Sequence, residues 1–393
     1  MANVMELLEI VQAAKPKFVS LDRDSCLSVR NRNAKCTKCM DSCPSEAINI
    51  QFNNIDINHD ICVACGSCAT ACPTGSIESI QPSRDDIVEN CKAFIGEGAS
   101  EIYIACSRIA SKHLVSADRI VEVPCLAMID ESILLEAAVE GCEKVYLVDG
   151  SCATCRNVKV NESINSVAGL ADYLLAVCEN ICEVIRTSEF PQDLLIEDLG
   201  AKISDSRRDF FTKLGSNVFT GAKSAVKVGI DQKLNSSEQR ASIALPRFND
   251  GYEKLANTRS SMVLDCIEQL GGLKTESIDT RLFATIDIDL DKCKACSMCE
   301  MFCPSGAILM IGEKPTNKPR FNLLASVAEE KAPEHHFEFL ASSCISCNTC
   351  VNICMGKCMS MNTSVLAAEL FSAQPKVIGT PVDNPGVSAT KSS

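Results

Sequence analysis

The sequence predicts an α+β protein in which two copies of a cysteine-rich module flank a small parallel α/β domain and a helical linker region. The first observation is a repeat: residues 55–77 read IDINHDICVACGSCATACPTGSI and residues 286–308 read IDIDLDKCKACSMCEMFCPSGAI. All four cysteines, the proline, a glycine and the last isoleucine recur at one constant offset. The second observation is that strand-like apolar segments alternate with helical patterns between the repeats, which favours parallel strands joined by helices.

The expected elements can be placed in order along the chain. The segments are an N-terminal helix (1–20, amphipathic over 5–14), the first module (21–82), a linker (81–97), the α/β domain (98–189), the helical linker region (190–280), the second module (281–362) and a disordered tail (372–393). Within the α/β domain the predicted strands are Ile102–Ala105, Ile120–Val123 and Val145–Val148. The predicted helices there are Glu131–Glu140 and Ser163–Ile185.

Composition narrows the functional classes. The chain has 393 residues, of which 26 are cysteine, and a formal net charge of −13. Disulfide scaffolds are usually short and secreted, but the first residues lack a basic segment followed by an apolar one. No run approaches about 18 consecutive apolar residues, the length of a membrane span. We therefore expect a cytoplasmic protein without an integral membrane segment, whose cysteines bind metal, and whose acidity favours basic protein partners over nucleic acid.

Sixteen cysteines form four groups with short, regular gaps. Two groups follow C-x2-C-x2-C-x3-C-P: Cys62, Cys65, Cys68 and Cys72, and Cys293, Cys296, Cys299 and Cys303. The third keeps the spacing but has Met355 in place of the proline: Cys344, Cys347, Cys350 and Cys354. The remaining group has nine residues in its first gap: Cys26, Cys36, Cys39 and Cys43.

This spacing is that of the [4Fe–4S] run in which three close cysteines bind one cubane and the fourth binds its neighbour. The short gaps wrap the backbone around one cluster, while the Cys-Pro turn directs its thiolate towards the other. The predicted ligands are Cys26, Cys36, Cys39 and Cys72 for cluster one; Cys62, Cys65, Cys68 and Cys43 for cluster two; Cys293, Cys296, Cys299 and Cys354 for cluster three; and Cys344, Cys347, Cys350 and Cys303 for cluster four. Cys358 is an alternative to Cys354. Zinc ribbons, the other reading of paired CxxC knuckles, rarely repeat this pattern.

The two ends resemble bacterial two-cluster ferredoxins over Asp22–Ile80 and Thr285–Met359. The resemblance implies two ferredoxin-like 2[4Fe–4S] modules, four [4Fe–4S] clusters and electron transfer. The chain departs from that family in the gap 27–35 and in a long insertion at 309–343.

Four further cysteines follow the three predicted strands of the α/β domain: Cys106, Cys125, Cys152 and Cys155. Parallel strands end at one edge of a sheet, where ligands gather, so we expect these thiols to converge on a fifth cluster. The stretch 101–183, through IYIAC, VEVPCLAMIDESILLEAAVEGC and VYLVDGSCATC, resembles the delta subunit of methyl-viologen-reducing hydrogenase. It has one cysteine after the first strand where that family usually has a pair. The fifth cluster is therefore [2Fe–2S] or [4Fe–4S], and a metal-free domain is the alternative.

The other candidate residues have simpler interpretations. Six cysteines remain as buried core residues: Cys91, Cys142, Cys178, Cys182, Cys266 and Cys358. Cys178 and Cys182 would share one face of the predicted helix, which leaves ligation open. We expect His335 and His336 in a loop or edge strand. Residues 206–214, SRRDFFTKL, are interpreted as a basic helix face for a partner and not as an export signal.

The leading functional expectation is a non-catalytic electron-transfer subunit of an anaerobic redox complex, because no nucleotide loop, flavin fingerprint or catalytic triad is visible. The whole-chain pattern resembles polyferredoxin-type subunits, which implies hydrogenase-, heterodisulfide-reductase- or formate-dehydrogenase-like partners. One rival is a thiol/disulfide or small-substrate reductase that uses the Cys152–Cys155 pair. The other is a structural cluster scaffold.

Overall fold

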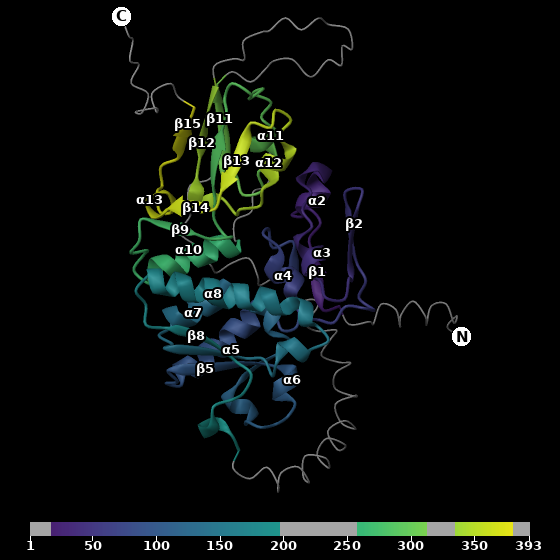
Figure 1. Ribbon diagram of the computed structural model, residues 1–393, viewed down its shortest axis with the longest axis vertical. Coiled ribbons are helices and arrows are strands. Elements are labelled where there is room, and N and C mark those ends of the chain that lie inside the picture. Colours follow the sequence, from purple (N-terminus) through teal and green to yellow (C-terminus); the bar gives the residue numbers. More distant parts are fainter. Residues whose placement is uncertain (1–16, 197–257, 313–334, 380–393) are drawn as a thin grey trace, which may run out of the picture.

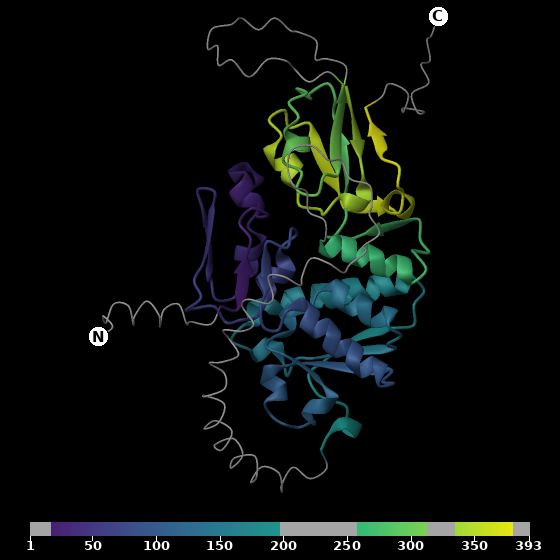
Figure 2. The ribbon, with the colours of Figure 1, turned by 180° about the vertical axis from the view of Figure 1, so that it is seen from behind.

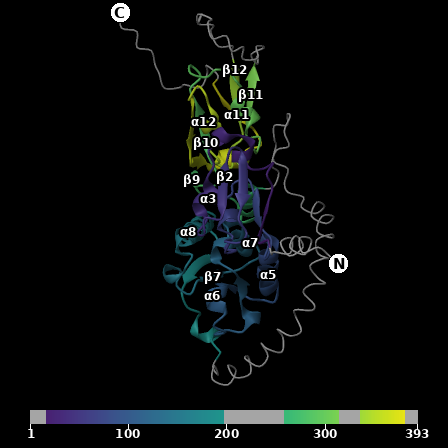
Figure 3. The ribbon, with the colours of Figure 1, turned by 90° about the vertical axis from the view of Figure 1, so that its right-hand side faces the viewer.

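The computed structural model describes residues 17–196, 258–312 and 335–379 in three packed parts. Figure 1 shows the C-terminal module at one end of the long axis, the central sheet at the other and the N-terminal module beside them. Seen from the side, the N-terminal module lies at the height where the other two parts meet (Figure 3). The helix expected at 5–14 and the basic segment 206–214 lie outside the described residues.

The N-terminal module is built from two small antiparallel ladders. Its strands are β1 (Val19–Leu21), β2 (Ile48–Gln51), β3 (Asn54–Ile57) and β4 (Ile77–Ser79), with β1 paired to β4 and β2 paired to β3. Its helices are α2 (Leu27–Arg30), the 3-10 turn η1 (Arg32–Ala34), α3 (Lys38–Ser42) and α4 (Ser67–Ala71). Because Val19 and Ser20 belong to β1, the N-terminal helix predicted over 1–20 is wrong at its described end.

The central part is a four-stranded parallel sheet in the order β6-β5-β7-β8. The strands are β5 (Glu101–Cys106), β6 (Val121–Val123), β7 (Lys144–Val148) and β8 (Glu183–Thr187). The main helices are α5 (Arg84–Gly96), α7 (Glu131–Val139) and α8 (Asn161–Val177). Shorter elements are α6 (Ser107–Ala110), η2 (Ala117–Arg119), η3 (Leu126–Met128), η4 (Cys152–Thr154), η5 (Val158–Val160) and η6 (Gln192–Leu194).

Two sequence predictions for this part are wrong. The segment 81–97 is not a linker, because Ser83 and Asp86 form a capping box and α5 buries Ile87, Val88 and Cys91. The helix predicted over 163–185 ends at Val177, and a turn leads into β8. Because α8 ends before Cys178 and Cys182 directly precedes β8, the two cysteines do not share a helix face.

The C-terminal part begins with α10 (Arg259–Gln269), whose N-terminus is capped by Thr258 and Ser261. Its strands are β9 (Ser277–Asp279), β10 (Thr285–Ile288), β11 (Ile308–Gly312), β12 (His335–Phe339), β13 (Met359–Asn362), β14 (Ser364–Leu366) and β15 (Lys376–Ile378). Its other helices are α11 (Met298–Met301), η7 (Ala341–Ser343), α12 (Thr349–Ile353) and α13 (Ala367–Leu370). β10 pairs with β13, β9 pairs with β14, and β11, β12 and β15 form a three-stranded sheet.

The insertion and the tail both contribute strands to this part, so the prediction of a disordered tail is wrong over its described residues. The described ends of the insertion 309–343 are strands, β11 and β12, which pair with each other. The tail predicted as disordered from residue 372 contains β15, which pairs with β12. His335 and His336 therefore lie in the middle strand of the sheet, although at their level β12 pairs with β11 alone.

The parts contact each other through specific residues. α10 lies between the C-terminal module and α7 and α8 (Figure 2), and one continuous cluster of buried apolar side chains joins these two parts. The Glu131 carboxylate, on α7, is fully buried and pairs with Arg281 and, at 3.7 Å, with Arg259. The N-terminal module has its own small core and docks through Thr70, whose hydroxyl donates to the Ala127 carbonyl oxygen at 3.0 Å. Among the described residues, no helix is long and apolar enough to cross a membrane.

Candidate metal centres

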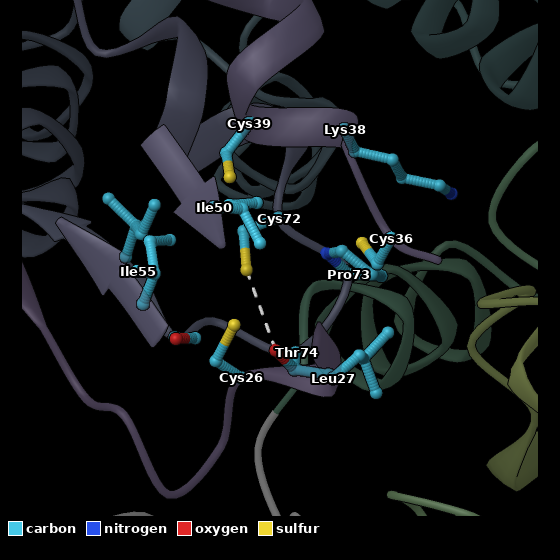
Figure 4. Close-up of a pocket in the computed structure, with 12 residues that line it drawn as sticks. Cys26, Leu27, Cys36, Lys38, Cys39, Ile50, Ile55, Cys72, Pro73 and Thr74 are labelled. Carbon is cyan, nitrogen blue, oxygen red and sulfur yellow. Dashed lines mark hydrogen bonds between the residues drawn. The ribbon is translucent and has the colours of Figure 1, made fainter. Parts of the chain in front are cut away.

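The first set of cysteines surrounds one cavity in the N-terminal module (Figure 4). Its thiols come from three places in the sequence: Cys26, Cys36, Cys39 and Cys72. Apolar side chains such as Ile55 and Ile77 complete the wall. We call this set ring one, and it contains the four cysteines that the sequence grouped for cluster one.

A second cavity in the same module is lined by the thiols of ring two: Cys43, Cys62, Cys65 and Cys68. The backbone amide of Ala47 donates to Cys43 Sγ at 3.3 Å. The module therefore exchanges Cys43 and Cys72, because each follows the helix of one ring and lines the cavity of the other.

The C-terminal module repeats this arrangement. Ring three lines one cavity with five thiols, those of Cys293, Cys296, Cys299, Cys354 and Cys358. Ring four consists of Cys303, Cys344, Cys347 and Cys350. Burial raises the pKa of Cys350 well above its ordinary value, and the charges of the other three members raise it further. The backbone amide of Ala307 donates to Cys303 Sγ at 3.2 Å, as Ala47 does to Cys43.

The same backbone turn follows all four exchanged cysteines. In each, the third residue after the cysteine has a positive φ: 54° at Glu46, 66° at Gly75, 68° at Gly306 and 48° at Lys357. The turn after Cys354 thus keeps the conformation of the others although Met355 replaces the proline. Proline is therefore not required for Cys354 to reach ring three.

Left-handed residues also flank the second cysteine of three rings. They are Ala64 and Gly66 in ring two, Ala295 and Ser297 in ring three, and Ser346 and Asn348 in ring four. This conformation is uncommon for residues other than glycine, so the loops hold a fixed, wrapped shape. In ring one, Lys35 alone has this left-handed conformation, directly before the second cysteine, Cys36. This ring is also the one with the longer first gap.

The donor set fits an iron–sulfur cluster. Among the described residues no three His, Cys, Asp or Glu side chains are close enough together to hold one metal ion; the thiols of rings one, two and three instead line cavities. Burial raises the pKa of Cys39 to about 12, of Cys65 to about 11 and of Cys299 to about 12. Such thiols need a strongly bound metal to lose their protons, and thiolates are the ligands of cubane clusters.

The four central cysteines lie at the carboxyl edge of the parallel sheet, as the sequence predicted. Cys106 ends β5, and its thiol donates to the Asp149 carbonyl oxygen at 3.2 Å. Burial raises the pKa of Cys125 to about 12, and the charges of Cys65, Cys152 and Cys106 raise it further. Cys125 therefore lies near both the central thiols and ring two.

A polar junction separates ring one from ring four. Figure 4 shows Lys38 pointing away from the ring-one cavity, and its ammonium interacts electrostatically with Cys36 and Cys347. A cavity of about 460 Å³ adjoins it. Four basic side chains and two acidic ones are among its lining: Lys38, Lys159, Arg259, Arg281, Asp41 and Glu162. We call this cavity the junction cavity.

The remaining cysteines are buried, as expected for core residues. Cys178 caps the end of α8, and Cys182 hydrogen bonds with Cys142, which precedes β7. Cys358 differs because its sulfur lies 3.4 Å from Cys354 Sγ.

Comparison with known proteins agrees with this geometry. Residues 34–76 and residues 285–355 each match a 4Fe-4S dicluster domain. The chain contains two 4Fe-4S dicluster ferredoxin domains. These domains are typical of electron transfer. The first match begins after Cys26 and the second ends before Cys358, so these two thiols are placed at the rings by the structure alone.

One curated relative is an uncharacterized ferredoxin of Methanocaldococcus jannaschii. It is 44% identical over 39 residues, which are 10% of this chain and 24% of the ferredoxin. The chain thus spans about a quarter of the length of that relative. No solved structure matches the chain.

Proposed function

We propose that this protein is an electron-transfer subunit whose two dicluster domains hold four [4Fe–4S] clusters. The observation that carries the proposal is the gathering of 17 cysteines into four rings, with two cysteines exchanged between the rings of each module. Clusters held in this way supply one-electron redox chemistry, with potentials set by charge, hydrogen bonds and exposure.

The proposed ligands are four members of each ring. They are Cys26, Cys36, Cys39 and Cys72; Cys43, Cys62, Cys65 and Cys68; Cys293, Cys296, Cys299 and Cys354; and Cys303, Cys344, Cys347 and Cys350. We assign Cys354 in preference to Cys358, because the turn after Cys354 has the conformation found after the other exchanged cysteines.

The protein itself fixes the positions of the thiols, shields them from water, and places N–H donors and a positive charge near them. The left-handed turns hold the thiols in place, and the apolar walls exclude water. The amides of Ala47 and Ala307 aim N–H donors at sulfur, which favours a thiolate over a thiol. Lys38 adds a positive charge near rings one and four. Positive charge and N–H donors both favour the more negative, reduced state of a site.

We further propose a fifth cluster, [2Fe–2S] or [4Fe–4S], on Cys106, Cys125, Cys152 and Cys155. Besides burial, the charges of other members of this set raise the pKa of Cys106, Cys125 and Cys152, which indicates that the thiols lie close together. The resemblance of this part to the hydrogenase delta subunit also supports the site. The position of these thiols beside Cys65 would make the central part an electron entry or exit next to ring two.

The partner is proposed to be a redox subunit of an anaerobic, cytoplasmic complex, of the hydrogenase, heterodisulfide-reductase or formate-dehydrogenase type. This choice rests on the resemblance of the whole chain to polyferredoxin-type subunits. The net charge of −13 supports a partner with a basic docking surface.

The rival function is reduction of a disulfide or small substrate by Cys152 and Cys155. Cys152 is 8% exposed, which disfavours direct attack on a substrate by that sulfur. Turnover of small disulfides by the isolated protein with reduced viologen would support the rival. Its absence, together with reversible bleaching by dithionite, would support electron transfer.

The decisive measurement is the metal content of the anaerobically purified full chain. We expect about 16 iron atoms and as many sulfides in the four rings, since each cubane holds four. A content near eight irons with stoichiometric zinc would contradict the proposal, because only one module would then serve electron transfer.

A further inference from the structure

Ring three has one thiol more than a cubane needs. Cys354 Sγ and Cys358 Sγ lie 3.4 Å apart, and both residues line the cavity that Cys293, Cys296 and Cys299 also line. In this geometry one sulfur can donate a hydrogen bond to the other. We compare the turn after Cys354 with the turns after the exchanged cysteines of the other three rings.

The position four residues after each exchanged cysteine is equivalent in the four turns. It is occupied by Ala47, Ser76, Ala307 and Cys358. In two of these turns the backbone amide at this position donates to the sulfur of the exchanged cysteine, which shows how close the position lies to the ring. Only in ring three does this position carry a second thiol.

The Cys358 side chain is held firmly at this place. It is 7% exposed, whereas Met355 in the same turn is 73% exposed. The Asp289 amide donates to the Cys358 carbonyl oxygen at 2.8 Å. A Cβ on Gly356 would lie 2.7 Å from the Lys292 carbonyl oxygen, so the turn packs tightly against the loop before Cys293.

We propose that Cys358 is a working member of ring three, both as a hydrogen-bond donor to Cys354 Sγ and as a reserve ligand where Cys354 is absent. As a ligand, Cys358 would lose its thiol proton to solvent and its sulfur would take the place of Cys354 Sγ, with no change in oxidation state. The proposal rests on the proposed function, since it assumes that ring three holds a cluster.

The test compares iron and sulfide content in full-length variants purified anaerobically. Cys354→Ala and Cys354→Ser are expected to keep the wild-type content, because Cys358 completes the ring. Cys354→Ala combined with Cys358→Ala is expected to lose about four iron atoms per chain, the content of one cubane. Cys72→Ala is the matched control, since Ser76 stands at the equivalent position and no reserve thiol exists there; it should lose the same amount.

The reserve role is overturned if both single variants at Cys354 lose as much iron as the double variant. Using the serine variant as well guards against a packing defect, because serine nearly keeps the side-chain volume. A wild-type protein that lacks the irons would instead overturn the proposed function, so the two failures are distinguishable.

The hydrogen-bond role has its own readout. Cys358→Ala should keep all the iron but lower the midpoint potential of one cluster in a redox titration followed by electron paramagnetic resonance, because an N–H or S–H donor to a ligand sulfur stabilises the reduced state. Midpoint potentials identical to those of the wild type would overturn this role.

Discussion

Asn352 Nδ2 donates a hydrogen bond of 2.8 Å to the carbonyl oxygen of Ala34, although the two residues are 318 positions apart in the sequence. Asn352 lies on α12 and Ala34 ends η1, so this bond joins the helix of ring four to the turn of ring one. The two dicluster domains are therefore in direct contact, although they lie near opposite ends of the sequence.

Replacing Asn352 by alanine should weaken this contact. The Ala34 carbonyl oxygen would lose its side-chain donor, and we expect a loss of about 1 kcal/mol in the free energy of unfolding. Denaturant unfolding of the anaerobic protein measures it. Asn49→Ala, at an exposed site on the β2–β3 hairpin, is the control and should stay near the wild-type value. Equal effects of the two changes would argue that the bond contributes nothing.

Replacing Glu131 by glutamine should be more damaging. The Glu131 carboxylate is fully buried and pairs with Arg281 and Arg259, which come from the C-terminal part. Removal of the negative charge leaves the guanidinium groups of Arg259 and Arg281 without their buried partner. Breaking such a buried pair costs about 3 kcal/mol, the lower end of the usual range, because Arg281 is partly solvated. The midpoint of denaturant unfolding should fall accordingly.

The matched control for that change is Glu140→Gln. Glu140 pairs with Lys92 at 2.7 Å, but both side chains are about two-fifths exposed. Exposed pairs contribute about 0–1 kcal/mol. If Glu140→Gln were as destabilising as Glu131→Gln, burial of the pair would not be the cause.

Lys38→Met should lower midpoint potentials. The ammonium interacts with Cys36 and Cys347, so its loss disfavours reduction at rings one and four. At an exposed site we expect a shift of about 20–60 mV, corresponding to a tenfold or smaller change in the one-electron equilibrium constant. Potentiometric titration with electron paramagnetic resonance measures it. Lys92→Met, remote from the rings on α5, should leave the potentials unchanged, and an equal shift there would point to net charge alone.

Cys152→Ser combined with Cys155→Ser tests the fifth cluster. In the full chain this variant should lose the iron bound in excess of about sixteen atoms while it keeps the four cubanes. Iron analysis and Mössbauer spectroscopy check both statements. A double variant that retains every iron atom of the wild type would show that the central thiols do not bind a cluster.

The sequence spacing predicted which cysteines the structure gathers, because two-residue gaps and the turn after the fourth cysteine act locally. Ligation by these thiols stays a prediction. The parallel strands β5, β6 and β7 were also visible as short apolar runs. Spacing could not decide whether Cys358 lies at ring three, since that depends on the left-handed conformation at Lys357, which a lysine does not signal.

Other features depend on docking between distant parts. The pairing of Glu131 with Arg281 and the contact of Asn352 with Ala34 have no local pattern, so the sequence did not predict a junction between rings one and four. The strand β8 was mistaken for the end of a helix because residues 174–185, LLAVCENICEVI, were interpreted as one continuous helical run. The helix α5 was missed although its signal, Ser83 followed three residues later by Asp86, was present.

The exchange of Cys43 and Cys72 has a consequence for biosynthesis. Ring two is complete only once Cys68 has been translated, and ring one must wait for Cys72, near the end of the same module. In the same way Cys293, the first thiol of ring three, waits for Cys354. Neither module can therefore complete both of its rings until almost all of that module has been translated. Truncation just before Cys72 would leave ring one with three thiols, and truncation just before Cys354 would do the same to ring three.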